Sequence, residues 1–438
     1  MVLLLSIDRI APELSPRDPG AADFSREIFC METGLKRPAG VSKQTPALPA
    51  DAPGNLGFST TGLARLGDVL RDEIARKTMP GAVVMIGRRG KVAYLEAFGS
   101  QDTLTGKPMR PDSVFRIFSM TKPVTSVAVM MLVEEGRLRI DEPLSKYIPE
   151  FADVQVARFS GNQMDLVPPQ RAITLHDLLR HTGGLSHELM SSPLQRQYAG
   201  LELARRDRTN EEHARLVASL PLLCQPGTAW NYSRSVEVLG RVVEIVSGQS
   251  LGAFLTERIL RPLQMFDTGF HIEENRGADR QAEPAANDPW TGKAVKLFDM
   301  LEKPAFEAAG GGLVSTAPDY VRFAQMLLNG GVLDGIRILG SRTLQLMTAN
   351  HLGQSVAPAP EPLPPGFGFG LGFAVRTHAG MAPFPGSVGQ YFWNGSAGTQ
   401  FWADPAEDLW ALLMVQAPGQ REHLRVLIRN LVYAAIED

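Results

Sequence analysis

The chain reads Phe118-Ser119-Met120-Thr121-Lys122-Pro123 and continues with an almost unbroken apolar run through Leu132. This run predicts a buried helix that ends near Glu135, because Gly136 follows. A proline fits only near the start of a helix, so Ser119 is expected at the exposed end. Residues three apart share one face of a helix. The sequence therefore predicts that the Ser119 hydroxyl and the Lys122 amine meet where a buried helix begins.

A serine and a lysine placed together can form a nucleophile and its base. A serine hydroxyl is a weak nucleophile until a neighbouring group takes its proton. Burial and the positive end of a helix dipole both disfavour the charged form of an amine, and a neutral amine can act as the base. A lone S-x-x-K motif is weak, since a capping serine beside a solvated lysine gives the same letters. The buried helix favours a catalytic role, because a lysine is rarely buried without a specific partner or function.

The composition is that of a globular protein without a metal. Of the 438 residues, 44% are hydrophobic and 21% are charged, and the formal net charge is -3. This balance gives no electrostatic footprint for nucleic acid or for an anionic membrane. The two cysteines, Cys30 and Cys224, cannot make a disulfide framework, and spacings such as CxxC or HExxH are absent. We therefore expect neither a metal nor a cofactor.

The apolar segments are too short to target the chain to a membrane. Residues 1–7 are apolar, but Asp8 and Arg9 interrupt them, and no basic segment comes first. A secretory signal needs an apolar segment of about 7–15 residues, and a membrane span needs about 20. We expect a cytoplasmic protein that binds a small molecule and has neither a nucleic acid nor a membrane as partner. The oligomeric state stays open.

The pattern of the sequence changes along the chain. Residues 1–57 are rich in Pro, Ala, Gly and Ser and predict an N-terminal extension that is partly ordered at best. Helices are predicted at 63–74, 119–135, 175–181, 211–220, 236–247, 251–260, 318–328 and 421–435. Strands are predicted at 82–87, 92–97, 370–376, 390–394, 399–404 and 409–416.

Strand patterns at both ends of the chain around a helical middle predict the fold class. We expect an α/β (α+β) fold with one antiparallel sheet, helices on its faces and an inserted, mostly helical domain. The α/β domain is predicted to comprise residues 58–140 and 310–438, and the helical domain residues 141–309.

A second candidate site segment is Pro226-Gly227-Thr228-Ala229-Trp230-Asn231-Tyr232-Ser233. It predicts a turn and a short aromatic stretch directly before the helix at 236–247. A tyrosine on such a loop can share protons with a serine and a lysine, and a neighbouring ammonium makes a phenol a better proton donor. The alternative is a tyrosine packed under the loop, which is the more common case on sequence alone.

A third candidate segment runs from Tyr391 to Trp402. Here an aromatic strand is interrupted by Asn394-Gly395-Ser396-Ala397-Gly398 and then resumes. Glycine at such a point permits close approach of another backbone or a ligand. Backbone N–H groups on an edge strand can hold the negative oxygen that forms during acyl transfer. The alternative is a hairpin turn with surface aromatics.

Other motifs point to structure instead of chemistry. Residues 248–252 match G-x-S-x-G, but a predicted helix precedes Ser250, whereas the nucleophile elbow with this motif requires a strand there. We predict that Ser250 caps a helix. His176, His181 and His187 lack a metal-ligand spacing, and His181 is expected to be structural.

Taken together, the three segments resemble the serine β-lactamase and penicillin-binding-protein superfamily. The similarity is greatest to its class C-like branch of serine esterases, often called family VIII carboxylesterases, and it extends over about 60–435. Four further segments carry it: 178–185, 240–244, 262–265 and 310–313. The resemblance implies a β-lactamase-like fold.

The resemblance also implies a role for each site residue. Ser119 would be the acylated nucleophile, Lys122 would activate it, and Tyr232 would be the partner general base and acid. The Trp393-Asn394-Gly395 stretch would replace the Lys-Thr-Gly strand motif of lactamases. The backbone N–H groups of Ser119 and Ser396 would form the oxyanion hole, where one donor is worth about 10²–10³ in rate.

Two departures from the lactamase pattern bear on the substrate. Lactamases commonly have a lysine at the position of Trp393, and an indole cannot attract a substrate carboxylate. The esterase branch often has Trp-Gly-Gly there, so Asn394 is a variation. Arg234 stands where lactamases tend to have an asparagine, which leaves amide recognition open. The tryptophan favours neutral esters, and the leading hypothesis takes short-chain, neutral carboxylic esters as substrates.

The leading hypothesis is therefore a serine carboxylesterase that works through an acyl-enzyme on Ser119. An amide hydrolase, such as a β-lactamase, a D-aminopeptidase or an amide-dimer hydrolase, is the alternative with the same nucleophile. An acyltransferase, or a receptor that acylates and never deacylates, also stays open.

Overall fold

The computed structural model describes residues 44–161, 163–353, 356–357 and 363–437. The predicted extension at 1–57 lies outside these residues except for its last part. In that part Leu48 and Leu56 are buried, and η1, a 3-10 helix, covers Pro53–Leu56. Ala50 forms a β-bridge with Val92. The described residues 44–57 therefore pack on the folded chain.

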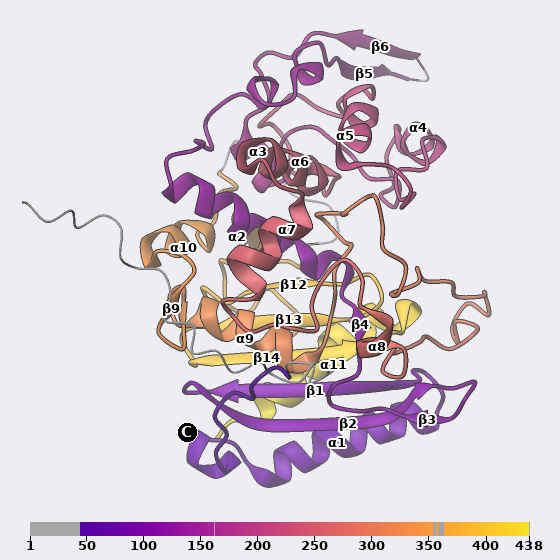
Figure 1. The fold of residues 1–438 in the computed structure, drawn as a ribbon, viewed down its shortest axis with the longest axis vertical. Coiled ribbons are helices and arrows are strands. Elements are labelled where there is room, and N and C mark those ends of the chain that lie inside the picture. The colour runs from indigo at the N-terminus through magenta and orange to yellow at the C-terminus, as the bar shows by residue number, and fades with distance from the viewer. Residues whose placement is uncertain (1–43, 162, 354–355, 358–362, 438) are drawn as a thin grey trace, which may run out of the picture. The chain divides into compact units, whose positions relative to one another are not determined.

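An eight-stranded antiparallel sheet forms the centre of the described chain (Figure 1). In order across the sheet, its strands are β10 (Phe367–Phe369), β11 (Ala374–Arg376), β12 (Tyr391–Asn394), β13 (Gln400–Asp404), β14 (Leu409–Val415), β1 (Gly81–Arg88), β2 (Lys91–Asp102) and β3 (Lys107–Pro108). β1 pairs with β14, so segments from the two ends of the chain meet inside the sheet. Every residue of β1 and β14 is buried, as expected when both faces of a sheet are covered.

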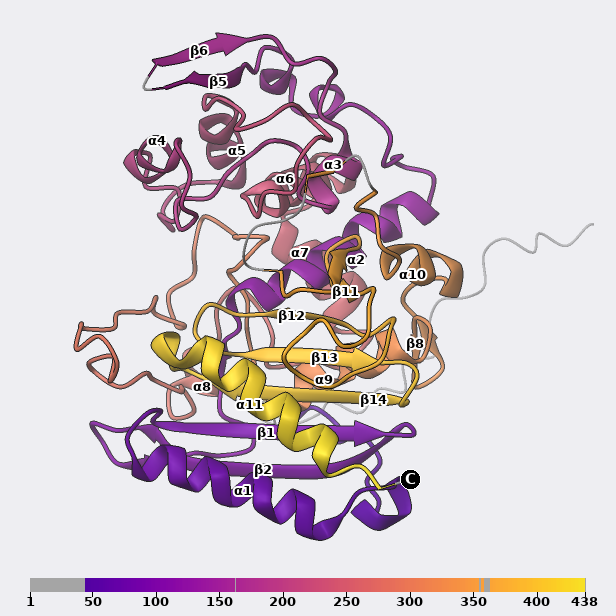
Figure 2. The same cartoon turned by 180° about the vertical axis from the view of Figure 1, so that it is seen from behind.

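Helices cover both faces of this sheet. α1 (Thr60–Ala75) and α11 (Arg421–Ala434) lie side by side on one face (Figure 2). α9 (Ala317–Leu328) packs on the other face, against β13 and β14 (Figure 1). Ser59 and Thr316 cap α1 and α9, because their side-chain oxygens accept backbone hydrogen bonds from the first turn. The prediction of an α/β fold with an antiparallel sheet flanked by helices is confirmed.

The segment from 141 to 309 is built mostly from helices and loops. Its helices are α3 (Leu175–Leu179), α4 (Gln195–Gly200), α5 (Asn210–Ala218), α6 (Ser235–Ser247), α7 (Leu251–Leu255), α8 (Glu274–Gly277), the π-helix η5 (Thr256–Leu260), and the 3-10 helices η3 (Leu144–Lys146) and η4 (Pro149–Ala152). The hairpin of β5 (Val156–Ser160) and β6 (Gln163–Val167) was missed, because its largely exposed strands carry no clear apolar pattern. The predicted boundaries of the two domains stay a prediction.

The remaining short elements lie mostly around the sheet. They are β4 (Phe115–Arg116), η2 (Phe118–Met120), β7 (Val314–Ser315), β8 (Val332–Leu333), β9 (Ile336–Arg337), α10 (Ser341–Met347) and η6 (Pro418–Gln420).

α2 (Thr121–Glu134) runs between the sheet and the helices of the 141–309 segment (Figure 1). All of its residues from Thr121 to Leu132 are buried, and it packs against α6 and α7. A helix that is apolar on all sides is buried on all sides, as the sequence predicted. Gly136 follows its end with φ of 67°, a conformation that suits glycine.

Three local predictions are wrong in detail. The α-helix begins at Thr121, because Ser119 belongs to the 3-10 turn η2 that precedes it. The strand predicted at 370–376 is reduced to β11, because a turn closed by the Gly370 N–H and the Phe373 carbonyl (2.7 Å) occupies its first half. β12 is an inner strand between β11 and β13, but its pairing with β11 covers only Tyr391 and Phe392.

Among the described residues, no single helix is long and apolar enough to cross a membrane. One bent pair, Ser235–Ser247 with Leu251–Leu260, meets the criterion by length and composition only.

Candidate active site

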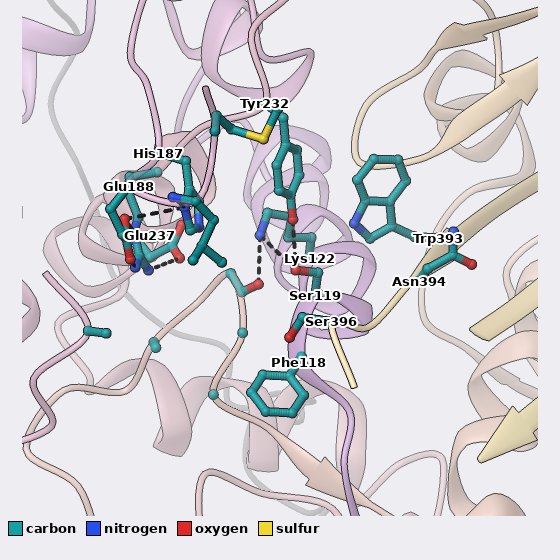
Figure 3. A pocket seen from close by; sticks show the side chains of 18 of the residues that line it. Phe118, Ser119, Lys122, His187, Glu188, Tyr232, Glu237, Trp393, Asn394 and Ser396 are labelled. Carbon is teal, nitrogen blue, oxygen red and sulfur yellow. Dashed lines mark hydrogen bonds and ion pairs between the residues drawn. The ribbon is translucent and has the colours of Figure 1, made fainter. Parts of the chain in front are cut away.

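The chain turns sharply immediately before Ser119. After β4, Phe118 adopts φ of 45°, a left-handed conformation that costs a non-glycine residue on the order of 1–3 kcal/mol. The Thr121 hydroxyl donates a hydrogen bond to the Phe118 carbonyl (2.6 Å) and closes this turn. The strained turn places the Ser119 side chain in the pocket, directly before the buried helix (Figure 3).

Lys122 lies one turn further on and is 1% exposed. Its Nζ donates to the carbonyl of Gly310 (2.7 Å) and lies 3.4 Å from the Oγ of Ser119. It also lies 4.7 Å from the centre of the Tyr232 ring, where a cation is attracted to the ring face. The structure thus brings Ser119 and Lys122 together, as the sequence predicted.

Tyr232 reaches the same point from the loop before α6. Its phenol O–H donates a hydrogen bond to Ser119 Oγ (2.7 Å). Backbone hydrogen bonds tie this loop to the segment 181–186: the N–H of Gly227 donates to the Thr182 carbonyl (2.8 Å) and the N–H of Asn231 to that of His181 (2.9 Å). These backbone hydrogen bonds fix the loop that carries Tyr232. The Tyr232 hydroxyl thus lies in one cluster with the side chains of Ser119 and Lys122.

The turn between β12 and β13 packs directly on the backbone before Ser119. A Cβ atom at Gly395 would lie 2.1 Å from Thr399 Oγ1 and 2.6 Å from the carbonyl oxygen of Ile117. Only glycine fits there, which agrees with the close approach predicted for this segment. As a result Ser396 lies beside Ser119 at the pocket wall (Figure 3).

Trp393 and Asn394 lie on the opposite side of Tyr232 from His187 and Glu237 (Figure 3). The Trp393 ring is 4% exposed and packs 5.4 Å from the ring of Tyr232. Its Nε1 is buried and has no hydrogen-bond partner among the described residues. The side-chain amide of Asn394 is oriented so that its nitrogen and its oxygen each have a hydrogen-bond partner. In this orientation the oxygen accepts a hydrogen bond from Arg425 Nε (3.2 Å). Asn394 thus contacts a cation of α11 at the pocket edge.

These side chains line one cavity of about 570 Å³. Part of its wall is apolar, and this part comprises Phe118, Leu189, Met190, Ala204, Phe298, Phe306, Ala308 and Trp393. The sequence did not identify Phe298 and Phe306, because they lie in irregular loops without a periodic signal.

A buried ion-pair cluster behind Lys122 was also missed. Arg234 donates to Glu188 (Nε to Oε2, 3.0 Å) and to Glu237 (Nη1 to Oε1, 2.8 Å). All three side chains line the pocket. The signal was present, because an arginine and a glutamate three apart at the start of a predicted helix share one face. Arg234 is therefore engaged by two carboxylates.

The histidines near the site are neutral at neutral pH. Burial, together with the charge of Lys122, lowers the pKa of His181 to about 3. Burial and Arg234 hold the pKa of His187 well below its usual value. His181 Nδ1 lies 3.1 Å from Ser233 Oγ, and its ring packs 5.0 Å from that of Tyr232. The contacts of His181 agree with the structural role that the sequence predicts.

The remaining sequence candidates lie elsewhere. Ser250 accepts a hydrogen bond from the N–H of Ala253 (3.2 Å) and caps α7, as predicted. His176 pairs with His351 (2.9 Å) outside the pocket. Within the described ranges, no group of three or more His, Cys, Asp or Glu side chains is arranged to hold a metal ion.

Comparison with known proteins gives three consistent similarities. The Beta-lactamase family model matches residues 66–435. Esterase EstB of Burkholderia gladioli is 32% identical over 392 residues, which cover 85% of this chain and 95% of that protein. Protein Rv1367c of Mycobacterium tuberculosis (strain ATCC 25618 / H37Rv) is 36% identical over 351 residues, covering 77% and 86%.

A solved structure shows the same similarity in three dimensions. EstCE1, described as a hydrolase with promiscuous acyltransferase activity, superimposes with a TM-score of 0.70 at 28% identity. The match covers 85% of this chain and 98% of that chain.

Proposed function

The chain is a serine hydrolase of the Beta-lactamase family, and we propose that it is a carboxylesterase that forms an acyl-enzyme on Ser119. Its substrates are short-chain, neutral carboxylic esters. The observation that carries this proposal is the convergence of two proton-transfer groups on one oxygen: Ser119 Oγ lies 2.7 Å from the Tyr232 hydroxyl and 3.4 Å from Lys122 Nζ.

Acylation begins with attack of Ser119 Oγ on the ester carbonyl. Lys122 reacts in its deprotonated form and takes the hydroxyl proton as the new bond forms. The present 3.4 Å separation is long for a hydrogen bond, and such contacts often tighten once substrate is bound. Tyr232 then delivers a proton to the leaving alcohol, since its hydroxyl already contacts the reacting oxygen.

The negative oxygen of the tetrahedral intermediate needs donors on the other side of the carbonyl. The backbone N–H groups of Ser119 and Ser396 are the proposed donors, because the tight packing of Gly395 on Ile117 holds their two segments together. Water then attacks the acyl-enzyme, with Lys122 and Tyr232 reversing their roles.

The walls of the pocket support a neutral substrate. Apolar side chains form part of the pocket wall, and the buried indole of Trp393 occupies the position where a lysine would attract a carboxylate. A cavity of about 570 Å³ is in the usual range for sites that bind small molecules.

The cations at the pocket edge do not overturn this preference. Arg421 and Arg425 both pair with Glu422 (3.3 Å and 2.5 Å), so their charge is partly compensated. Lys296 is exposed, where water and salt screen its charge. Arg206 lies against the ring of Phe298, 4.4 Å from its centre.

The proposal is tested with the purified full-length protein on a substrate panel. The panel contains p-nitrophenyl acetate, butyrate and octanoate, nitrocefin, and D-alanyl p-nitroanilide. We expect the acetate and butyrate esters to turn over fastest, and the Ser119→Ala variant to fold normally but lose activity by at least about 10³-fold. Near-wild-type turnover by Ser119→Ala, or faster amide than ester cleavage, would overturn the proposal.

Acyl transfer to an alcohol is the second candidate function. It is supported by the similarity to EstCE1, a hydrolase with promiscuous acyltransferase activity, of which this chain covers 98%. The same acyl-enzyme serves both reactions, because an alcohol can take the place of water. Adding benzyl alcohol to the ester assay and measuring benzyl ester by chromatography separates the two. Benzyl ester exceeding free acid would favour transfer.

A further inference from the structure

A buried carboxylate, that of Glu237, lies near Lys122 in the pocket wall (Figure 3). Glu237 is the third residue of α6 and is 2% exposed. Its Oε1 accepts a hydrogen bond from Arg234 Nη1 (2.8 Å), whereas its Oε2 has no hydrogen-bond partner among the residues that the structure describes. A buried ion with one unsatisfied oxygen is costly for stability alone, which points to a role in the site.

The charges around Glu237 leave a net negative charge beside Lys122. Arg234 is shared between Glu188 and Glu237, so one guanidinium serves two carboxylates. Burial keeps His187 and His213 neutral by lowering the pKa of each ring. The second positive charge that acts on Glu237 is that of Lys122.

Glu237 stays ionised because of these two cations. Burial by itself would raise the pKa of this carboxyl group, but the charges of Lys122 and Arg234 hold the pKa well below its usual value. The carboxylate is therefore negative throughout the pH range in which an esterase is assayed.

One glycine links the carboxylate to the lysine. A Cβ atom at Gly310 would lie 2.4 Å from Glu237 Oε2, so only glycine fits against the carboxylate. The carbonyl of the same residue accepts the hydrogen bond from Lys122 Nζ (2.7 Å). Carboxylate and amine thus approach the same glycine residue.

We propose that Glu237 is a positioning residue for Lys122, which stabilises the ammonium formed when Lys122 takes the proton of Ser119. The inference rests on the proposed function and extends it to a fourth group. In a Ser-His-Asp triad the histidine becomes charged when it takes the proton, and the aspartate stabilises that charge without taking the proton itself. Glu237 would do the same for Lys122.

The proton balance of the step is complete without Glu237 changing state. The proton of Ser119 Oγ moves to Lys122 Nζ, the Oγ–C bond forms, and an electron pair of the carbonyl moves onto its oxygen. When the intermediate collapses, the bond to the leaving alcohol breaks, the leaving oxygen takes a proton from Tyr232, and Lys122 returns one to Tyr232. The carboxylate acts only through its charge, which is effective in a buried site.

Several titratable and charged groups lie around Glu237, and the test must separate their effects from the effect of Glu237 itself. They come from α2, the loop 181–188, the Tyr232 loop, α5 and α6, and comprise Lys122, His181, His187, Glu188, Tyr232, Arg234 and His213.

The experiment compares kcat, KM and pH profiles of wild type, Glu237→Gln and Glu237→Asp on p-nitrophenyl acetate. Glutamine keeps the shape and the acceptor for Arg234 but removes the charge. We expect kcat of Glu237→Gln to fall by at least about 10-fold with KM changed less than about 3-fold. The acid limb of the kcat/KM profile should move to lower pH, because protonated Lys122 loses its stabilisation. Glu237→Asp should recover most of kcat.

Glu244→Gln is the matched control, since Glu244 is another carboxylate of α6, half-buried and likewise paired with an arginine, Arg241 (3.2 Å). It should change the unfolding transition without moving the acid limb. If Glu237→Gln and Glu244→Gln give the same kinetics and pH profile, Glu237 is only a structural clamp and the inference fails. If wild type hydrolyses no ester, the proposed function fails instead. The rate of Ser119 labelling by a p-nitrophenyl phosphonate in wild type and Glu237→Gln then still tests the inference, and equal rates would overturn it.

Discussion

The hydroxyls of Ser119 and Tyr232 lie 113 positions apart in the chain and 2.7 Å apart in space. Ser119 comes from a strained turn at the start of α2, and Tyr232 from a loop fixed on the helical segment. The contact therefore joins the α2 turn to the 141–309 segment at the reacting oxygen. Its geometry depends on both segments being in place.

Tyr232→Phe tests the chemical part of this contact. The variant keeps the ring, which packs against His181 and Trp393, and removes only the hydroxyl. We expect kcat on p-nitrophenyl acetate to fall by about 10²–10⁴-fold with a small change in KM, since general acid–base catalysis contributes about this much. Steady-state kinetics measure both constants. A kcat within about 3-fold of wild type would show that Tyr232 only packs beneath the loop.

Gly395→Ala tests the packing that holds Ser396 beside Ser119. The added methyl would lie 2.1 Å from Thr399 Oγ1 and 2.6 Å from the Ile117 carbonyl, so the β12–β13 turn must move away. We expect a loss of about 1–3 kcal/mol in the free energy of unfolding and a larger fractional loss of kcat. Urea unfolding and ester turnover are measured together.

Gly54→Ala provides the control for this variant, because no atom lies within 4 Å of the added Cβ. It should be close to wild type in both measurements. Equal behaviour of the two variants would contradict the role given to the turn.

His213→Phe tests how buried neutral histidines limit acid stability. His213 is 1% exposed and stacks on Phe306 (4.2 Å), and burial lowers its pKa from 6.5 to about 3. Between these two pH values the unfolded chain binds a proton that the folded chain does not, so stability falls as the pH drops below about 6.5. Phenylalanine can retain the stacking and removes this loss.

We therefore expect His213→Phe to lose less unfolding free energy than wild type between pH 6.5 and 5, by up to about 2 kcal/mol. Urea unfolding at pH 7, 6 and 5 gives the comparison. Parallel pH dependence of the two proteins would show that His213 does not contribute in this window.

The sequence predicted well wherever local patterns decide the structure. The hairpin of β1 and β2, the buried helix after Lys122 and the amphipathic helix α11 were all placed to within a few residues. The spacing of the apolar residues in these segments follows their buried faces, so it can be read from the sequence alone. Gly136 also indicated the end of the buried helix.

The sequence could not place features that depend on long-range packing. The left-handed turn at Phe118 has no glycine to announce it, because surrounding contacts impose the conformation. β12 was expected at a sheet edge, but the short β11 pairs with its first half, and such pairing is not visible in either strand alone. The carboxylate of Glu237 was overlooked, because its relation to Lys122 passes through Gly310 from a third segment.

The central claim is that Ser119 carries the acyl group during turnover. It is tested most directly by mass spectrometry of the protein quenched with acid during turnover of p-nitrophenyl butyrate. We expect a mass increase of one butyryl group, located by peptide mapping on Ser119, absent in Ser119→Ala and more persistent in Tyr232→Phe. A butyryl group on another serine such as Ser250, or continued turnover by Ser119→Ala, would contradict the account.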